Sequence, residues 1–102
     1  MLITPDGDSM LALLCSWEAL VRLLGLAAAE QVSLCLQHLR VAESLADLAM
    51  FGFVITPEPD RPDHGRVSLD HGGVLIVRTH NGKKCGPKTS ELCVVALERR
   101  RS

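Results

Sequence analysis

The sequence predicts an α+β domain in which three helices precede a small antiparallel β-sheet, all within a single domain spanning residues 1–102. Before Gly52, apolar residues recur every three or four positions, which is the spacing of one buried helix face. After Gly52 the pattern changes to alternation, which is typical of strands. A chain of 102 residues, 47% of them hydrophobic, is long enough for one small domain with its own core.

Helices are predicted over 9–24, 27–33 and 36–50. The first has a candidate N-cap at Asp8 or Ser9, and it is followed by Gly25, a residue type that often ends helices. It is apolar on more than one face, which is typical either of a central core helix or of a helix that also forms a subunit interface. Residues 33–35 are the candidate turn between the second and third helices.

Strands are predicted over 53–56, 66–70, 74–80 and 91–97. The segment 57–65 holds three prolines and is expected to be an irregular loop. Residues 1–5 are expected to form a short strand or a loose tail. The dipeptide Asn81-Gly82 indicates a hairpin, and residues 83–90 form a basic loop after it.

The two halves of the chain differ in charge, although the formal net charge is only −1. Residues 1–60 hold eight acidic residues against two arginines, whereas residues 61–102 hold nine basic residues against four acidic ones. This asymmetry predicts either an anionic partner for the second half or an ordinary solvated face. The first residues carry no basic leader and no long uncharged apolar run, so a cytoplasmic protein without a membrane span is expected. Its thiols are then reduced, with Cys15 and Cys35 as small core residues.

A resemblance to a known family lies in Ala29–Asp70. The string AEQVSLCLQHLRVA is similar to the helix-turn-helix of bacterial repressors, with Ala29 as the small residue, Ser33 as the break and Leu34 as the apolar anchor. The string that follows, LADLAMFGFVITPEPDRPDHGRVSLD, resembles the end of a recognition helix followed by a wing. Together they resemble the winged helix-turn-helix DNA-binding domain of bacterial or phage repressors.

The resemblance implies a transcriptional regulator that places helix 36–50 in the major groove of double-stranded DNA and the wing on its backbone. The side chains expected at that DNA surface are of types that bond base edges or phosphates. They are Gln37, His38, Arg40, Ser44, Arg61, His64, Arg66, Lys83 and Lys84. The apolar first helix also predicts a homodimer through Leu13, Trp17 and Leu20, because isologous pairing is the commonest assembly of small chains.

A second interpretation keeps an α+β fold but makes the chain a non-enzymatic protein-interaction module, such as a phage or plasmid inhibitor or an assembly subunit. The acidic first half favours this interpretation, and so do the apolar residues Cys35 and Leu36 on the expected recognition face. The basic second half and the wing favour DNA.

No cofactor, catalytic residue or metal site is predicted, and the chain is expected not to be an enzyme. Metal-ligand residue types of the second half are His64, His71, His80, Cys85 and Cys93. However, seven residues separate the two cysteines, unlike the short pairs of zinc sites. A small ribonuclease-type toxin would use such histidines beside basic residues, but the glycine-rich phosphate-loop motif is absent. These two alternatives stay open.

Overall fold

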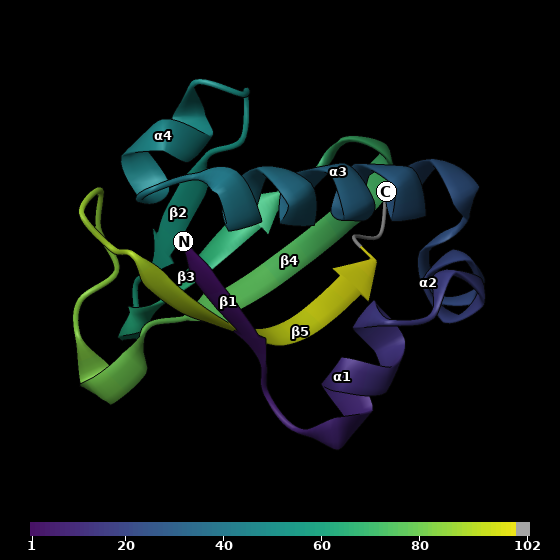
Figure 1. The fold of residues 1–102 in the computed structure, drawn as a ribbon, viewed down its shortest axis with the longest axis horizontal. Coiled ribbons are helices and arrows are strands. Elements are labelled where there is room, and N and C mark those ends of the chain that lie inside the picture. The colour runs from purple at the N-terminus through teal and green to yellow at the C-terminus, as the bar shows by residue number, and fades with distance from the viewer. Residues whose placement is uncertain (100–102) are drawn as a thin grey trace.

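The computed structural model describes residues 1–99, apart from the side chains of Asp70 and Asn81. Its helices are α1 (Asp8–Leu14), α2 (Trp17–Leu24), α3 (Leu26–Val41) and α4 (Leu45–Ala49), with short 3-10 helices η1 (Asp70–Gly72) and η2 (His80–Gly82). Its strands are β1 (Leu2–Pro5), β2 (Ile55–Glu58), β3 (Arg61–Ser68), β4 (Gly73–Arg78) and β5 (Glu91–Arg99). The strands form one sheet in the order β1-β5-β4-β3-β2, so the first and last strands lie side by side (Figure 1).

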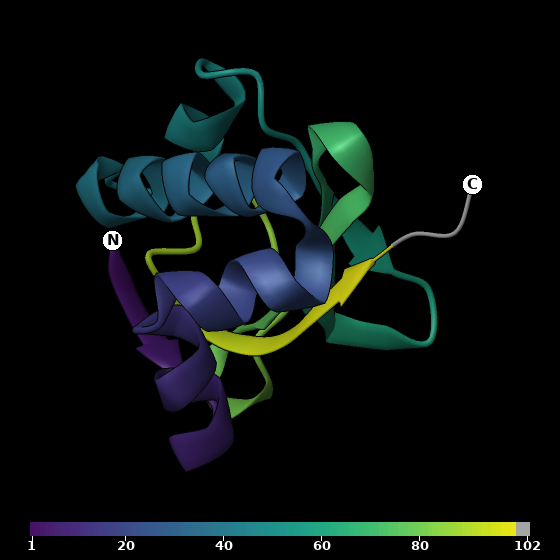
Figure 2. The ribbon, with the colours of Figure 1, turned by 90° about the vertical axis from the view of Figure 1, so that its right-hand side faces the viewer.

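The core lies between one face of the sheet and the helices, with α3 running across the strands (Figure 2). The inner face of α3 is completely buried, and its members are Ala28, Ala29, Val32, Cys35, Leu36 and Leu39. They belong to one cluster with inward-facing strand residues, among them Val67, Leu75, Val77 and Val94. Each fully buried Val or Leu contributes roughly 1.5–3 kcal/mol relative to an exposed one. No helix of residues 1–99 covers the opposite face of the sheet, which is called the open face below.

The predicted arrangement, a winged helix-turn-helix with three helices followed by an antiparallel sheet, is wrong. Four helices lie between β1 and β2, and the sheet is mixed because β1 runs parallel to β5 while the other neighbouring pairs are antiparallel. Of the two possibilities expected for residues 1–5, a strand or a loose tail, the structure contains the strand, and Ile3 lies opposite Leu92. This pairing joins the two ends of the described chain, and no local pattern signals it, because it depends on burial against distant residues.

The predicted turn of the helix-turn-helix does not exist, because α3 runs through residues 33–35 without a break. Ser33 is neither glycine nor proline, so it tolerates a helix interior at a small penalty. Val32 and Cys35 on either side of it both lie on the buried stripe, which is continuous only if the helix continues. Burial of that stripe therefore outweighs the weak helix propensity of the serine.

The predicted helices 36–50 and 9–24 are each divided in the structure. Ala42 has an extended backbone (φ −68°, ψ 143°) and ends α3, so the expected recognition helix is split between α3 and α4. Ser16 divides the other, because its hydroxyl accepts a hydrogen bond from the Ala19 N–H at 3.2 Å and caps α2. Cys15 at this break is exposed, so its predicted core position is wrong, whereas the burial of Cys35 is confirmed.

Two strands extend into the predicted proline loop at 57–65. β2 includes Pro57 and β3 includes Pro62, leaving only a turn at residues 59–60. The sheet tolerates these prolines because β2 is an edge strand and the register of the β2–β3 pair shifts after Pro57. The hairpin expected at Asn81-Gly82 is instead η2 followed by a longer connection, although β4 and β5 are antiparallel neighbours.

Gly65 on β3 provides a test of this packing. A Cβ atom there would lie 2.5 Å from Ile55 Cγ2 and 3.2 Å from Cys85 Sγ. The isoleucine methyl branches directly from its β-carbon and cannot swing aside as a flexible chain end does. We predict that Gly65→Ala lowers the free energy of unfolding by about 1–3 kcal/mol, the usual penalty for overpacking, as measured by urea denaturation.

Gly86→Ala is the matched control, because a Cβ atom at Gly86 meets nothing within 4 Å. Its effect should stay within about 0.5 kcal/mol, as for most surface substitutions. Equal losses in the two variants would contradict the close packing of Gly65.

Candidate functional site

The residues predicted to bind DNA fall into three groups in the structure. On α3 lie Gln37, His38 and Arg40, and Ser44 is the N-cap of α4. On β3 lie Arg61, His64 and Arg66. Lys83 and Lys84 lie in the connection between η2 and β5.

The α3 group and the β3 group do not share a surface. His64 and Arg66 alternate along β3 with Gly65 and Val67, which are buried on the core side. Successive side chains of a strand point to opposite faces, so His64 and Arg66 point to the open face of the sheet. Gln37 and Arg40, by contrast, are among the exposed residues of α3, on the helical side of the molecule. The structure thus does not place these residues as a recognition helix and a neighbouring wing.

Basic residues of the open face have acidic neighbours. Arg66 Nε lies 3.3 Å from Glu58 Oε1, and Arg78 Nη2 lies 3.5 Å from Asp6 Oδ1. His64 Nδ1 lies 2.8 Å from Asp63 Oδ1, and the hydrogen bond with His64 lowers the pKa of Asp63. Exposed pairs of this kind contribute little stability. They do, however, neutralise positive charge that a phosphate backbone would otherwise meet.

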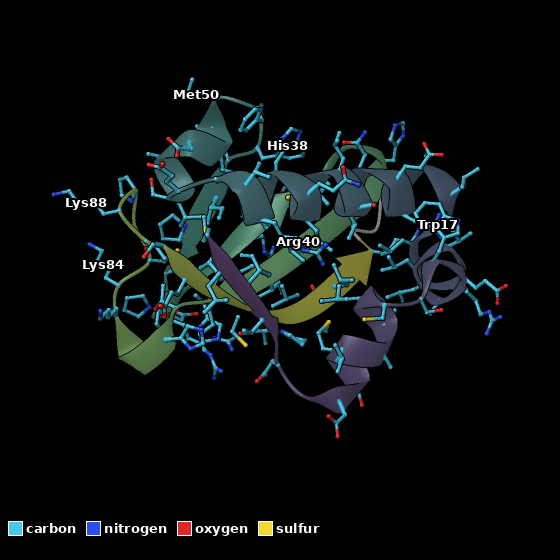
Figure 3. All side chains as sticks on the ribbon, in the orientation of Figure 1. Trp17, His38, Arg40, Met50, Lys84 and Lys88 are labelled. Carbon is cyan, nitrogen blue, oxygen red and sulfur yellow. The ribbon has the colours of Figure 1, made fainter. Side chains whose placement is uncertain are left out.

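Exposed apolar side chains gather instead over α3 and α4. The α3–α4 surface is defined here by six residues, namely Leu34, His38, Val41, Met50, Phe51 and Val54. The exposed fractions reach 82% for Met50 and 73% for Val41, which are high values for apolar residues. The rings of His38 and Phe51 stack with their centroids 4.2 Å apart, and this contact joins α3 to the turn after α4. Figure 3 shows His38 and Met50 on the same side of the molecule.

An apolar hollow of about 280 Å³ opens beside this surface. Its walls come from α4, from the segment leading into β2 and from the 83–90 connection; they include Leu45, Ala49, Phe53, Val54, Cys85 and Pro87. Val54 belongs both to the α3–α4 surface and to the wall of the hollow. Cys85 is buried there, and its burial raises the pKa of its thiol. The hollow is of a size and chemistry to accept a large apolar side chain.

A second and larger cavity, of about 530 Å³, lies on the 79–91 segment. Lys83, Lys84 and Lys88 all line it. His80 and the hydroxyl residues Thr79, Thr89 and Ser90 also contribute to its walls. The lysines lie within six consecutive positions, which is a visible sequence signal, whereas the cavity itself depends on the fold. Figure 3 shows Lys84 and Lys88 at the opposite end of the molecule from Trp17.

No three His, Cys, Asp or Glu side chains within the described part of the chain lie close enough together to hold a metal ion. Across residues 1–99, no helix has both the length and the apolar character needed to cross a membrane. Comparisons of the chain with protein-family models, with curated protein sequences and with solved structures find no match.

The four free cysteines differ in exposure, which predicts their reactivity. Cys15 is exposed, whereas Cys35, Cys85 and Cys93 are buried, the last with its sulfur 3.9 Å from Arg78 Nη2. Burial also raises the pKa of Cys35 to about 12, so its thiolate is scarce at neutral pH.

We predict that Ellman's reagent modifies a single thiol, that of Cys15, rapidly in the folded chain. Cys15→Ser should remove the rapid phase and Cys93→Ser should leave it unchanged; a second rapid thiol would contradict the described burial.

Proposed function

We propose that this chain is a non-enzymatic protein-interaction module that binds its partner through the α3–α4 surface. The observation that carries the proposal is that α3 exposes large apolar side chains on the side away from the core, between the polar residues Glu30, Gln37 and Arg40. Its inner face is buried in the core, while Leu26, Leu34 and Val41 on its outer face are exposed to 58%, 42% and 73%. A solvent-exposed helix face is normally polar, so large apolar side chains on this side are typical of a surface that a partner covers.

The hollow beside the surface supports the same function. Binding energy at protein interfaces concentrates in a few apolar anchors that fill pockets and exclude water. Val54 lines such a pocket here and is 65% exposed, and Ala49, which also lines it, directly precedes the exposed Met50. An aromatic or aliphatic side chain of the partner would enter the hollow, while the outer face of α3 would extend the contact.

The acidic charge of the helical segment indicates which kind of partner would bind this surface. The segment that contains all four helices, residues 8–49, has five acidic residues against Arg22 and Arg40. Complementary charge speeds association and rejects wrong partners. The partner is therefore expected to present an apolar anchor bordered by basic residues. An inhibitor or an assembly subunit would use a surface of this kind.

A second copy of the chain is the alternative binding partner. Of the residues predicted to form a homodimer, Leu20 is buried in the core, Leu13 is partly buried against it, and Trp17 is 46% exposed. A dimer through this region would have to use Trp17 and Leu23 on α2, which are only 46% and 43% exposed and lie outside the α3–α4 surface. We predict that sedimentation at high micromolar concentration gives a monomer. A dimer that Trp17→Glu dissociates would replace the proposed heterologous partner with self-association.

The partner-binding test uses matched apolar-to-acid substitutions on the full chain. Met50→Glu and Val54→Glu alter the proposed surface, and Leu11→Glu alters an apolar residue of α1 with 47% exposure. The partner is first identified by cross-linking to the parent chain and is then purified. We predict that this partner binds Met50→Glu and Val54→Glu at least about tenfold more weakly than it binds the parent chain, which is a loss of about 1.4 kcal/mol in binding free energy. Leu11→Glu should bind like the parent, as measured by calorimetry. Equal affinities for all four chains would contradict the proposed surface.

Double-stranded DNA is the competing proposal, and the basic second half of the chain is the observation that favours it. Because the α3 group lies on the helical side of the molecule and the β3 group on the open face of the sheet, a duplex would meet only one of them. Fluorescence anisotropy with random duplex DNA at two salt concentrations separates the two functions. Contacts to phosphates must weaken as salt rises. We predict that α3 makes no such salt-dependent contact, so Arg40→Ala should leave the affinity for duplex DNA unchanged. Tight binding of the duplex that Arg40→Ala weakens would favour the DNA-binding function.

A further inference from the structure

All the lysines of this chain lie around one cavity. The sequence contains Lys83, Lys84 and Lys88 and no other lysine, and each of them lines the 530 Å³ cavity on the 79–91 segment. The arginines differ from them, because two arginines, Arg66 and Arg78, have acidic neighbours. For the three lysines, by contrast, no salt bridge is formed with any residue in the range 1–99. Glu91 is the one carboxylate among the residues that line the cavity.

Hydrogen bonds to β3 hold the cavity wall in place at its start and in its middle. Thr79 is buried, and its N–H donates to the Asp63 carbonyl of β3 at 2.8 Å. The Cys85 N–H donates to the Pro62 carbonyl at 2.9 Å, which fixes the middle of the segment to the same strand. A preorganised wall lowers the ordering penalty that binding a ligand would otherwise incur.

The other side of the wall is attached to α4. The Leu45 N–H donates to the Thr89 carbonyl at 3.1 Å, and the Ala46 N–H donates to the Pro87 carbonyl at 3.0 Å. Within the segment, the Gly86 N–H donates to Thr89 Oγ1 at 3.0 Å. The lysine side chains are exposed, so three long cationic side chains extend from a backbone that these hydrogen bonds hold in place.

Polar groups near the lysines complete the chemistry of the cavity. His80 lines it, and its Nε2 atom is buried with no hydrogen-bond partner among the described residues. A buried polar nitrogen without a hydrogen-bond partner is energetically costly. Hydroxyl groups of Thr89 and Ser90 add further donors.

We propose that this cavity binds a small phosphorylated molecule, with its phosphate group held by the three lysines. Lysine binds phosphate as a point charge, and several donors around one dianion match its oxygens. The cavity is larger than a phosphate group alone and falls in the volume range of small-molecule sites, so it has room for an organic part. None of the residues that define the α3–α4 surface lines this cavity, which shares only Gly86 and Pro87 with the apolar hollow, and the site does not depend on the protein-interaction function.

The test is a titration of the full chain, labelled with nitrogen-15 and followed through its amide NMR signals. The probes are inorganic phosphate, glucose 6-phosphate and AMP, each compared at equal ionic strength with glucose or adenosine as the ligand without phosphate. We expect phosphate-dependent shifts confined to amides of residues 79–91. The absence of shifts in that segment with all three phosphate probes at millimolar concentration would overturn the proposal, and so would equal shifts with adenosine and AMP.

Charge variants of opposite sign separate a specific site from general attraction. Lys84→Gln with Lys88→Gln should weaken binding of the best probe at least about fivefold, because two nearby cations are lost. Arg22→Gln with Arg40→Gln changes the net charge by the same amount on exposed helix positions and should leave the affinity unchanged. Glu91→Gln removes the one lining carboxylate and should strengthen binding by about twofold. Equal losses in the lysine and arginine double variants would overturn the site.

Duplex DNA is included as a further probe. We expect it to bind more weakly than the phosphorylated small molecules when compared at equal phosphate concentration. If the duplex instead binds more tightly, and the lysine double variant abolishes that binding, the lysines form a nucleic-acid surface and the small-molecule proposal is wrong.

Discussion

The packing of α3 across the sheet is the constraint on which the other features depend. Gly73 on β4 and Ala28 on α3 are close neighbours, because a Cβ atom at Gly73 would lie at van der Waals contact, 3.7 Å, from Ala28 Cβ. With α3 fixed at this distance, its C-terminal end lies near the start of the chain, where the Met1 nitrogen donates to the Arg40 carbonyl at 3.2 Å. β1 can then run beside β5 as a parallel edge strand. The fold is therefore closed by contacts between residues far apart in the sequence.

The same helix explains why the chain presents an apolar exterior. Because one face of α3 alone packs into the core, Leu34 and Val41 on the other face stay exposed to solvent. The stacking of His38 on Phe51 extends this exterior to the turn after α4. Singly exposed apolar residues are ordinary on protein surfaces, but a contiguous group beside an apolar hollow is typical of interaction sites. The acidic charge of the helical segment narrows the partners that would fit.

The 83–90 connection links the two cavities. Gly86 and Pro87 line both the apolar hollow and the lysine cavity. Backbone hydrogen bonds from Leu45 and Ala46 attach this shared wall to α4. A displacement of the wall would consequently change the shape of both cavities, because close-packed segments transmit shifts instead of absorbing them. The chain thus carries an apolar surface and a cationic cavity that meet at one short segment of backbone.

The sequence by itself determined the local features: helical spacing before Gly52, the strands at 74–78 and 91–97, and the lysine cluster, because each rests on neighbouring residues. The pairing of β1 with β5, the continuity of α3 through Ser33 and the separation of Arg40 on α3 from Arg66 on the open face depend on the packed fold. Local patterns state which residues prefer burial, but not which distant surface buries them. The packing of the whole chain makes that choice, and here it replaced a helix-turn-helix with one long helix on a mixed sheet.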